Sequence, residues 1–490
     1  MEQFTDVVQA LAQGKQPASN NHISVYESSF EQKDGTNVIM AKAGTEKYLV
    51  AAGQGELFNS LTGDTVAGGK VCGLTHENRI VLNKFFAYTV PQAFGTEIAT
   101  MGLGDRLGVA SPGHIETTRN RKVKPILAQQ SIRELTLLNR TMTDILDAAS
   151  FAVFQEGYKD GYGADADHIK LEKDIEYALE LGFSFITLDC SEQIRNDVED
   201  AQKEYAGLPV DRKEYYNHYL NKTFEVQGLN ITFDDESLAK NVLVYGEAID
   251  FMEHVYNEYI SKAEKAIDFE ISIDETETVT APEAHFFVAE ELRRRGVTVQ
   301  SLAPRFCGEF QKGIDYIGDL EQFEKELHEH AEIAKYFGYK LSIHSGSDKF
   351  SVFPIIGKYT EGLLHIKTAG TNWLEAVRVI AVENPDLYRR MHVYAEDHFE
   401  ETLKYYHVTP DLDSIAPLNE TADADLPTYM DHDAARQLFH VTYGILLTAK
   451  NEAGEDLFRK EFFDTLLNNE DTYRQGLVKH IGRHLDLLGL

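Results

Sequence analysis

The sequence of 490 residues predicts an α/β fold, a (β/α)8 barrel of the TIM type with segments added at both ends. From about residue 96, short apolar runs alternate with helix-like stretches, as in parallel strands joined by crossover helices. Eight such runs occur over roughly 280 residues, close to the about 250 residues of this barrel. An open doubly wound sheet gives the same alternation and stays the alternative. The expected strands are Ile98 to Gly102, Pro125 to Gln129, Phe151 to Gln155, Ser184 to Asp189, Ile267 to Ile273, Val297 to Leu302, Lys340 to His344 and Leu364 to Thr368.

The chain is expected to have three parts. Residues 1–95 carry short β-like runs broken by Gly and Asn and read as an accessory segment. Residues 96–372 form the expected catalytic barrel, interrupted by a Tyr-rich, helix-like insertion at 195–265. Residues 373–490 form a helical extension with apolar residues three and four apart, a pattern typical of packing helices or of a contact between copies in a homo-oligomer.

Charge and hydropathy exclude several kinds of partner. The chain has 80 acidic and 47 basic residues, a net charge of −33, which would repel a nucleic-acid backbone. No apolar run approaches the roughly 20 residues needed to cross a bilayer, and the first residues lack the pattern of a signal peptide. We therefore expect a cytoplasmic protein without a membrane partner. The three cysteines are far apart in sequence and predict neither a disulfide framework nor a cysteine zinc site.

Polar side chains follow the expected strands where each strand ends. The stretch 338–350 passes from a buried strand into polar and small residues at His344. Because parallel α/β folds place their chemistry at the carboxyl ends of strands, such residues should converge. The other candidates at these ends are Asp105, Arg106, Asp189, Glu270, Ser272, Asp274, Arg305, Glu309, Ser345, Lys349, Lys367 and Thr371. Among the basic residues near these ends, Arg305, Lys312, Lys349 and Lys367 could offset the acidic surface for an anionic substrate.

The fifth expected strand carries two carboxyl groups on one face. Glu270 and Asp274 alternate with Phe269, Ile271 and Ile273, so one face meets the helices and the other faces the barrel interior. Buried carboxylates are costly without partners. We therefore expect them to work on a cation, a base or a substrate.

A glycine-containing loop is expected after the third strand, at residues 161–170, before a helix at 171–181. Its glycines let the backbone approach a ligand closely. Asp167 fits equally well as an ordinary helix N-cap or as a functional carboxyl. His168 is harder to explain as a cap, and a neutral imidazole is a common ligand for divalent metals.

His168, Glu309 and His344 together would make a metal site of two imidazoles and one carboxylate, with positions left open for substrate and water. His365 could replace one of them. Such a set suits Zn, Mn, Ni, Co or Fe, so the metal stays undetermined. The run 328–330 (His-Glu-His) lacks the spacing of four that a helical zinc pair needs, and predicts a solvated helix face.

Several segments in order resemble one family. They are GLGDRLGVASPGHI, GADADHIK, IDFEISIDETETVT, SLAPRFCGEFQKGIDYIGD, KLSIHSGSDKFSVFP and LLHIKTAGTNW. As a set they resemble the tagaturonate epimerases, metal-dependent TIM-barrel enzymes that interconvert tagaturonate and fructuronate in hexuronate breakdown. The resemblance implies a divalent metal held from the motifs of His168, Glu309 and His344. It also implies an acid/base pair of Asp167 and a fifth-strand carboxyl, chosen among Asp274, Glu270 and Glu275.

The implied reaction inverts C3, which is β to the C5 ketone, so that retro-aldol cleavage and re-formation of the C3–C4 bond is the expected route. We assign Asp167 as the base and Asp274 as the acid, and expect Arg305, Lys312 or Lys349 to hold the substrate carboxylate. A metal-dependent ketose aldolase of class II type is one alternative. A non-catalytic sugar-acid-binding protein is another, although it leaves the two interior carboxyls without a purpose.

Overall fold

The structure is a computed structural model of the chain, and it describes residues 1–207, 214–274 and 278–490. Its centre is a closed barrel with the strand order β12-β13-β14-β15-β6-β7-β8-β9, and each neighbouring pair is parallel. The (β/α)8 expectation is therefore confirmed, and the open-sheet alternative is wrong. The strands are β6 (Ala99–Leu103), β7 (Val123–Ser131), β8 (Gly163–Ile169), β9 (Phe185–Asp189), β12 (Asp268–Ser272), β13 (Ser301–Ala303), β14 (Lys340–Ile343) and β15 (Leu364–Thr368).

The third strand differs from the expectation. Phe151 to Gln155 is the last part of helix α6 (Met142–Gln155), which begins with a capping box at Thr141. A short apolar run does not distinguish a strand from a buried helix, and here every residue from Ala149 to Gln155 is buried. The third strand is β8, so Asp167 and His168 lie within a strand. Asp167 is accordingly not the N-cap of the next helix, which begins at Glu172.

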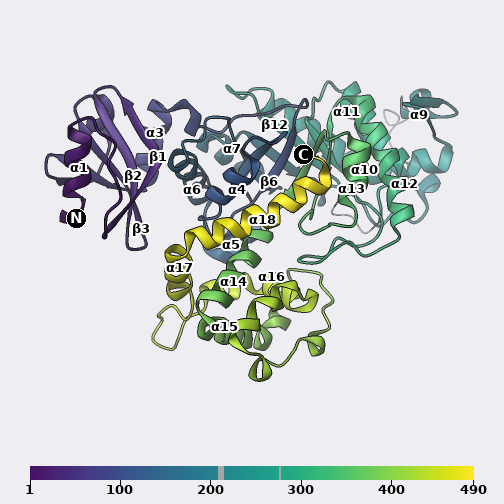
Figure 1. The fold of residues 1–490 in the computed structure, drawn as a ribbon. Coiled ribbons are helices and arrows are strands. Elements are labelled where there is room, and N and C mark those ends of the chain that lie inside the picture. Colours follow the sequence, from purple (N-terminus) through teal and green to yellow (C-terminus); the bar gives the residue numbers. More distant parts are fainter. Residues whose placement is uncertain (208–213, 275–277) are drawn as a thin grey trace.

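Helices surround the barrel, as Figure 1 shows. The strands are buried on both faces, and the interior is polar: Gln129, Asp165, Thr187, Glu270 and His365 are all at most 1% exposed. The alternation predicted for β12 places Phe269 and Ile271 in the apolar core. The surrounding helices are α4 (Ser111–Thr118), α5 (Ile132–Leu138), α6, α7 (Glu172–Leu181), α10 (Asp235–Val255), α11 (Pro282–Arg294), α12 (Leu320–Phe337), α13 (Phe353–Thr360) and α14 (Thr371–Glu383).

Residues before the barrel form a five-stranded antiparallel sheet of order β1-β2-β3-β5-β4, at the left in Figure 1. Helix α1 packs on one face through Val7, Val8 and Leu11, and α3 and the end of α6 pack on the other. The elements are α1 (Thr5–Ala12), β1 (Ile23–Lys33), β2 (Thr36–Ala43), β3 (Glu46–Gly53), α2 (Glu56–Ser60), β4 (Asp64–Val66), β5 (Gly69–Gly73) and α3 (His76–Phe85).

The insertion between β9 and β12 adds α8 (Ala201–Ala206), α9 (Glu214–Tyr219), the hairpin β10 (Thr223–Val226) and β11 (Leu229–Thr232), and α10. Aromatic rings join it to α11, where Tyr219 and Phe233 lie against Phe287 at centroid distances of 5.2 and 6.3 Å. This packing fixes the insertion to the barrel wall.

The C-terminal part is helical, as expected, with its own core around Trp373. Its helices are α15 (Pro385–Asp397), α16 (Asp433–Thr448), α17 (Arg459–Asn468) and α18 (Glu470–Leu488). Helix α18 returns along the barrel and packs against α4, α13 and α14 (Figure 1). Arg436 and His480 of this part contact the carboxylate of Asp348 at 2.6 and 2.5 Å, which anchors the loop that follows β14.

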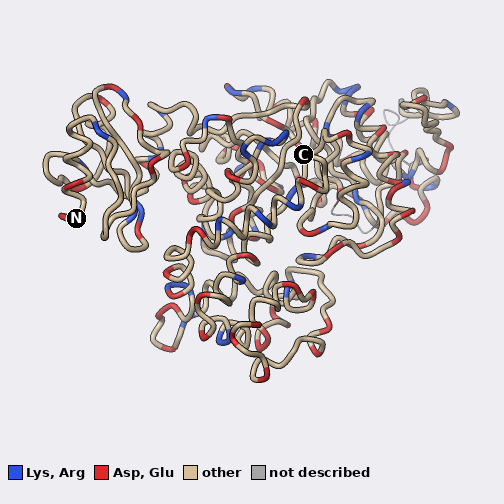
Figure 2. The backbone as a smooth tube through the Cα atoms, in the orientation of Figure 1, with Lys and Arg blue, Asp and Glu red and all other residues tan. Residues whose placement is uncertain are grey.

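Acidic residues are spread over all three parts of the molecule (Figure 2), consistent with a charge that belongs to the general surface. Among the helices in the described ranges, none combines the length and apolarity that a membrane crossing requires.

The histidine run on α12 is only half solvated. His328 is partly exposed, but His330 is fully buried, where its Nδ1 lies 2.8 Å from His285 Nδ1 and its Nε2 lies 3.1 Å from the carbonyl oxygen of Thr280. The expectation of a solvated face is wrong for His330, because the helix turns this residue toward α11. Burial lowers the pKa of His330 to about 4 and the pKa of His285 well below its usual value.

These buried histidines predict acid lability. In the unfolded chain an imidazole takes up a proton near pH 6.5, whereas His330 in the folded protein stays neutral until about pH 4. The unfolded state therefore binds more protons in this window, and the free energy of unfolding should fall as pH decreases, by up to about 3 kcal/mol for His330. Urea unfolding from about pH 7 to about pH 4.5 measures this. The change of the unfolding free energy with pH should be smaller in His330→Asn than in the native protein, and unchanged in the exposed control His22→Asn. The same pH dependence in the native protein and both variants would contradict the prediction.

Candidate active site

Two adjoining cavities open at the carboxyl ends of the strands. The first has a volume of about 400 Å³ and is lined by Asp167, His168, Lys312, His344 and Lys367, among others. The second, of about 360 Å³, shares Asp274, Lys312 and His344 with it and adds Arg305 and Glu309. Residues expected at the strand ends from distant parts of the sequence therefore do meet at one place.

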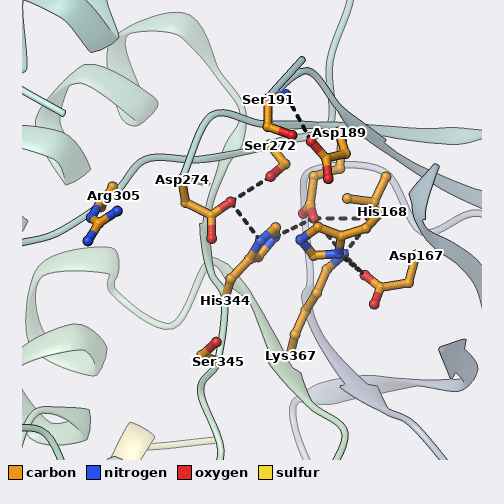
Figure 3. A network of polar contacts seen from close by, with 12 residues as sticks. Asp167, His168, Asp189, Ser191, Ser272, Asp274, Arg305, His344, Ser345 and Lys367 are labelled. Atoms are coloured by element: carbon orange, nitrogen blue, oxygen red, sulfur yellow. Dashed lines mark hydrogen bonds and ion pairs between the residues drawn. The ribbon is translucent and has the colours of Figure 1, made fainter. Parts of the chain in front are cut away.

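The two imidazoles expected to bind metal lie together. The ring centroids of His168 and His344 are 4.9 Å apart (Figure 3). His168 has a φ of 54°, and the pairing of β8 with β9 shifts register between Ala166 and Ile169. Such an irregularity redirects a side chain that the plain strand would point elsewhere. Here it accompanies the placement of His168 at the cavity wall.

Carboxylates surround His344 on two sides. Its Nε2 lies 2.8 Å from Glu270 Oε1, and its Nδ1 lies 3.1 Å from Asp274 Oδ1. Burial alone would lower the pKa of His344, but the two carboxylates outweigh it and raise the pKa to about 10. Asp274 also accepts a hydrogen bond from Ser272 Oγ at 2.5 Å (Figure 3). His344 in turn holds the pKa of Asp274 below its usual value, against the effect of burial.

Asp167 and His168 are partners as well as neighbours in sequence. Asp167 Oδ1 lies 2.8 Å from His168 Nδ1 and 2.6 Å from the ammonium of Lys367. Although burial acts in the other direction, these two cations keep the pKa of Asp167 well below its usual value. The carboxyl is therefore ionised at neutral pH.

The third expected ligand, Glu309, does not lie beside the imidazoles. It follows β13, pairs through its backbone with Ile317, and its carboxylate accepts a hydrogen bond from Gln311. Among the described residues, His168, Asp274 and His344 bring ligand atoms within 4.8 Å of one another. The structure thus joins two of the three expected ligands, sets Asp274 against them, and leaves Glu309 on the wall of the second cavity.

His365 is no substitute ligand in this arrangement. It lies inside the barrel with its Nδ1 2.8 Å from Thr100 Oγ1 and its ring against Phe185 at 4.8 Å. Burial lowers its pKa to about 3. Among the fifth-strand carboxyls, Glu270 is fully buried and lines neither cavity, whereas Asp274 lines both. Glu275, the other candidate acid, lies outside the described residues.

The three basic residues expected to bind a substrate carboxylate have different environments. Lys349 is fully buried and donates to the carbonyl oxygens of Gln311, Ile314 and Ser347, so its ammonium serves the fold. Arg305 borders the second cavity and lies apart from the imidazoles (Figure 3). Lys312 borders both cavities, and its Nζ donates to Ser345 Oγ at 2.9 Å. Lys312 alone among these three therefore faces both cavities.

Sequence reasoning missed groups from the C-terminal extension. Tyr406 and His440 line the first cavity, although the extension was expected only to pack. Arg133, which follows β7, also lines both cavities and lies over the Tyr406 ring at 5.0 Å. A search of strand ends could have found Arg133 once β7 was extended to Ser131. Nothing in the local sequence of Tyr406 or His440 indicates a site.

Comparison with known proteins places this site in a family. The model of the tagaturonate epimerase family matches residues 26–488, most of the chain. The chain belongs to the tagaturonate epimerase family. The predicted resemblance is confirmed, and with it the assignment to the carbohydrate epimerases, which are isomerases.

Relatives of this epimerase agree over nearly their whole length. A tagaturonate/fructuronate epimerase of Thermotoga maritima is 43% identical over 473 residues, which cover 95% of this chain and 96% of the relative. Two crystal structures of the fructuronate-tagaturonate epimerase UxaE from Cohnella laeviribosi, one native and one with glycerol, have sequences 56% identical to this chain. Each covers 100% of both chains with a TM-score of 0.95.

Proposed function

We propose that this chain interconverts D-tagaturonate and D-fructuronate by inversion at C3, with a divalent metal ion. The observation that carries the proposal is the pair His168 and His344, set with ionised carboxylates on the wall of a cavity of about 400 Å³ in a tagaturonate epimerase fold. A cavity of this size suits a single sugar acid.

The residues present fit a divalent metal. His344 Nδ1 is buried and, within the described residues, makes no hydrogen bond of good geometry, although Asp274 lies beside it. Each imidazole also holds one ring nitrogen against a buried carboxylate, as metal-bound histidines commonly do. We propose His168, His344 and Glu309 as the ligands, which requires the carboxylate of Glu309 to move from the wall of the second cavity toward the imidazoles. Imidazole and carboxylate suit Zn, Mn, Ni, Co or Fe.

The position of the inverted carbon decides the chemistry. C3 is β to the ketone at C5, so that removing a proton next to the ketone acts on C4 and leaves C3 unchanged. Removing the C3 hydroxyl proton instead allows the C3–C4 bond to break, giving an aldehyde at C3 and an enediolate at C4–C5. The aldehyde turns its other face, the bond re-forms, and the new C3 oxygen takes up a proton. When bound, a metal ion supplies Lewis-acid stabilisation of the enediolate charge.

Asp167 and Asp274 are proposed to move these protons. Both line the first cavity, Asp167 from β8 and Asp274 from the segment after β12 (Figure 3). We assign Asp167 as the base for the C3 hydroxyl and Asp274 as the acid on the return. The low pKa of each carboxyl leaves both ionised in the resting site. Asp274 therefore has to take up a proton when the substrate binds before it can act as the acid, and Asp167 releases the proton it has removed after the C3–C4 bond re-forms.

The test is conversion in deuterated water. Metal-loaded protein incubated with fructuronate should give tagaturonate by NMR, with the C3 proton retained, because the C3–H bond never breaks in the retro-aldol route. Deuterium at C3 would contradict this route. Release of two separable three-carbon fragments would identify an aldolase, and binding without conversion would identify a sugar-acid-binding protein.

Lys312 is the proposed partner of the substrate carboxylate. Its replacement by Met should raise KM about 10- to 100-fold with a smaller change in kcat, since a charge-assisted hydrogen bond is worth about 1.5–3 kcal/mol. Steady-state kinetics with fructuronate measures this. Arg305→Met, which alters only the second cavity, should change KM less. If Arg305→Met has the larger effect, the carboxylate is held there instead.

A further inference from the structure

We propose that Lys367 is a positioning residue that orients both metal-binding imidazoles, each through one carboxylate. The inference rests on the proposed function, because it assumes that His168 and His344 bind the metal. It assigns a role to a lysine that the proposed reaction does not otherwise use.

Lys367 lies on β15, lines the first cavity and is 4% exposed, and its side chain points toward the two imidazoles (Figure 3). Its ammonium lies 2.6 Å from Asp167 Oδ1, 2.9 Å from Glu270 Oε1 and 3.1 Å from Asp165 Oδ2. It also donates to Thr187 Oγ1 at 2.5 Å. Three carboxylates from β8 and β12 are therefore held around one buried cation.

The same carboxylate oxygens that receive Lys367 also receive the imidazoles. Asp167 Oδ1 is shared by Lys367 and His168 Nδ1, and Glu270 Oε1 is shared by Lys367 and His344 Nε2. The arrangement is the same for both histidines: the single Lys367 ammonium contacts a carboxylate oxygen, and that oxygen also contacts a ring nitrogen of the histidine. Moving the ammonium would move both acceptors at once.

This arrangement decides which ring nitrogen can bind metal. A carboxylate that accepts from one nitrogen fixes the tautomer and orientation of the ring. His168 would then ligate through Nε2 and His344 through Nδ1, the nitrogen that lies 3.1 Å from Asp274 Oδ1, so the two rings would use different nitrogens. Lys367 holds both carboxylates in place, because its ammonium lies within 3.1 Å of all three carboxylates, which would otherwise repel one another.

The experiment measures Co²⁺ binding to the full chain by calorimetry and by its visible absorption. Replacing Lys367 by Met should weaken Co²⁺ binding about 10- to 100-fold, as loss of such supporting groups does elsewhere, and should change the Co²⁺ spectrum. The matched control is Lys340→Met. Lys340 is also a buried barrel lysine, but it bonds to Thr100 Oγ1 and the carbonyl oxygen of Ile98, away from the imidazoles, and its loss should leave the Co²⁺ spectrum unchanged.

A double variant separates positioning from folding. Lys367→Met with Asp165→Asn removes one cation and one carboxylate together, so the net charge of the cluster is kept and the barrel should fold. It should still bind Co²⁺ more weakly than Asp165→Asn alone. Native-like affinity and spectrum in both Lys367 variants would overturn the proposal. If the native chain itself bound no Co²⁺, or if His344→Gln did not affect binding, the proposed metal site would fail instead.

Discussion

Replacing Asp274 by Asn is expected to lower kcat by at least about 100-fold while leaving the metal content of the protein near that of the native chain. Asn keeps the shape and can still accept a hydrogen bond from Ser272, but it cannot give a proton to the C3 oxygen. Because His168, His344 and Glu309 remain, the metal should be retained. Steady-state rates with fructuronate and elemental analysis of the purified variant measure the two effects.

Glu309→Gln is the companion variant. It should lower the metal content, because a carboxylate ligand is lost, whereas the amide still fits beside Gln311. The structure makes this comparison informative, since Asp274 and not Glu309 lies against the imidazoles. Loss of metal from Asp274→Asn with full metal in Glu309→Gln would show that Asp274 is the ligand and would end its assignment as the acid.

His344→Gln is expected to abolish metal binding and turnover together. The imidazole is one of the two nitrogen ligands and also the link between Glu270 and Asp274, so its loss leaves two buried carboxylates with fewer partners. Chelation of the native protein should give the same loss of turnover, restored by adding the metal back. His328→Gln, on the exposed side of α12, is the control and should behave as the native protein. If the chelated protein still converted fructuronate, the reaction would not need the metal.

The sequence predicted the barrel because its signal is local and repeated. Strands such as β9 and β15 are short apolar runs between helices, and their bounds were predicted to within a residue. The third strand was placed wrongly because Phe151 to Phe154 is a short apolar run, which a buried helix segment gives as readily as a strand. β8 was overlooked because GADADHI contains small and polar residues, which suit an interior that is itself polar.

Part of the site was also predicted from local sequence signals. The strand-end rule found His344 and Asp274, because parallel strands place their carboxyl ends at one edge. The glycine-containing stretch 161–170 indicated Asp167 and His168. It could not distinguish Lys349, which supports the loop, from Lys312, which borders the cavity. That difference depends on which carbonyl oxygens surround each ammonium, and those come from the loop after β13 and from Ser347.

By itself the sequence determined the fold class, the family and several of the ionisable groups at the barrel mouth, since each of these is encoded in local runs or short motifs. Only the tertiary structure decided which of these groups touch. It joined Lys367 to Asp167 and Glu270, placed Asp274 against His344, and brought Tyr406 from the extension to the cavity. The physical reason is that buried charges need partners within a few ångströms, and closing the barrel brings together side chains far apart in the chain, such as Lys367 and Asp167, which are 200 residues apart.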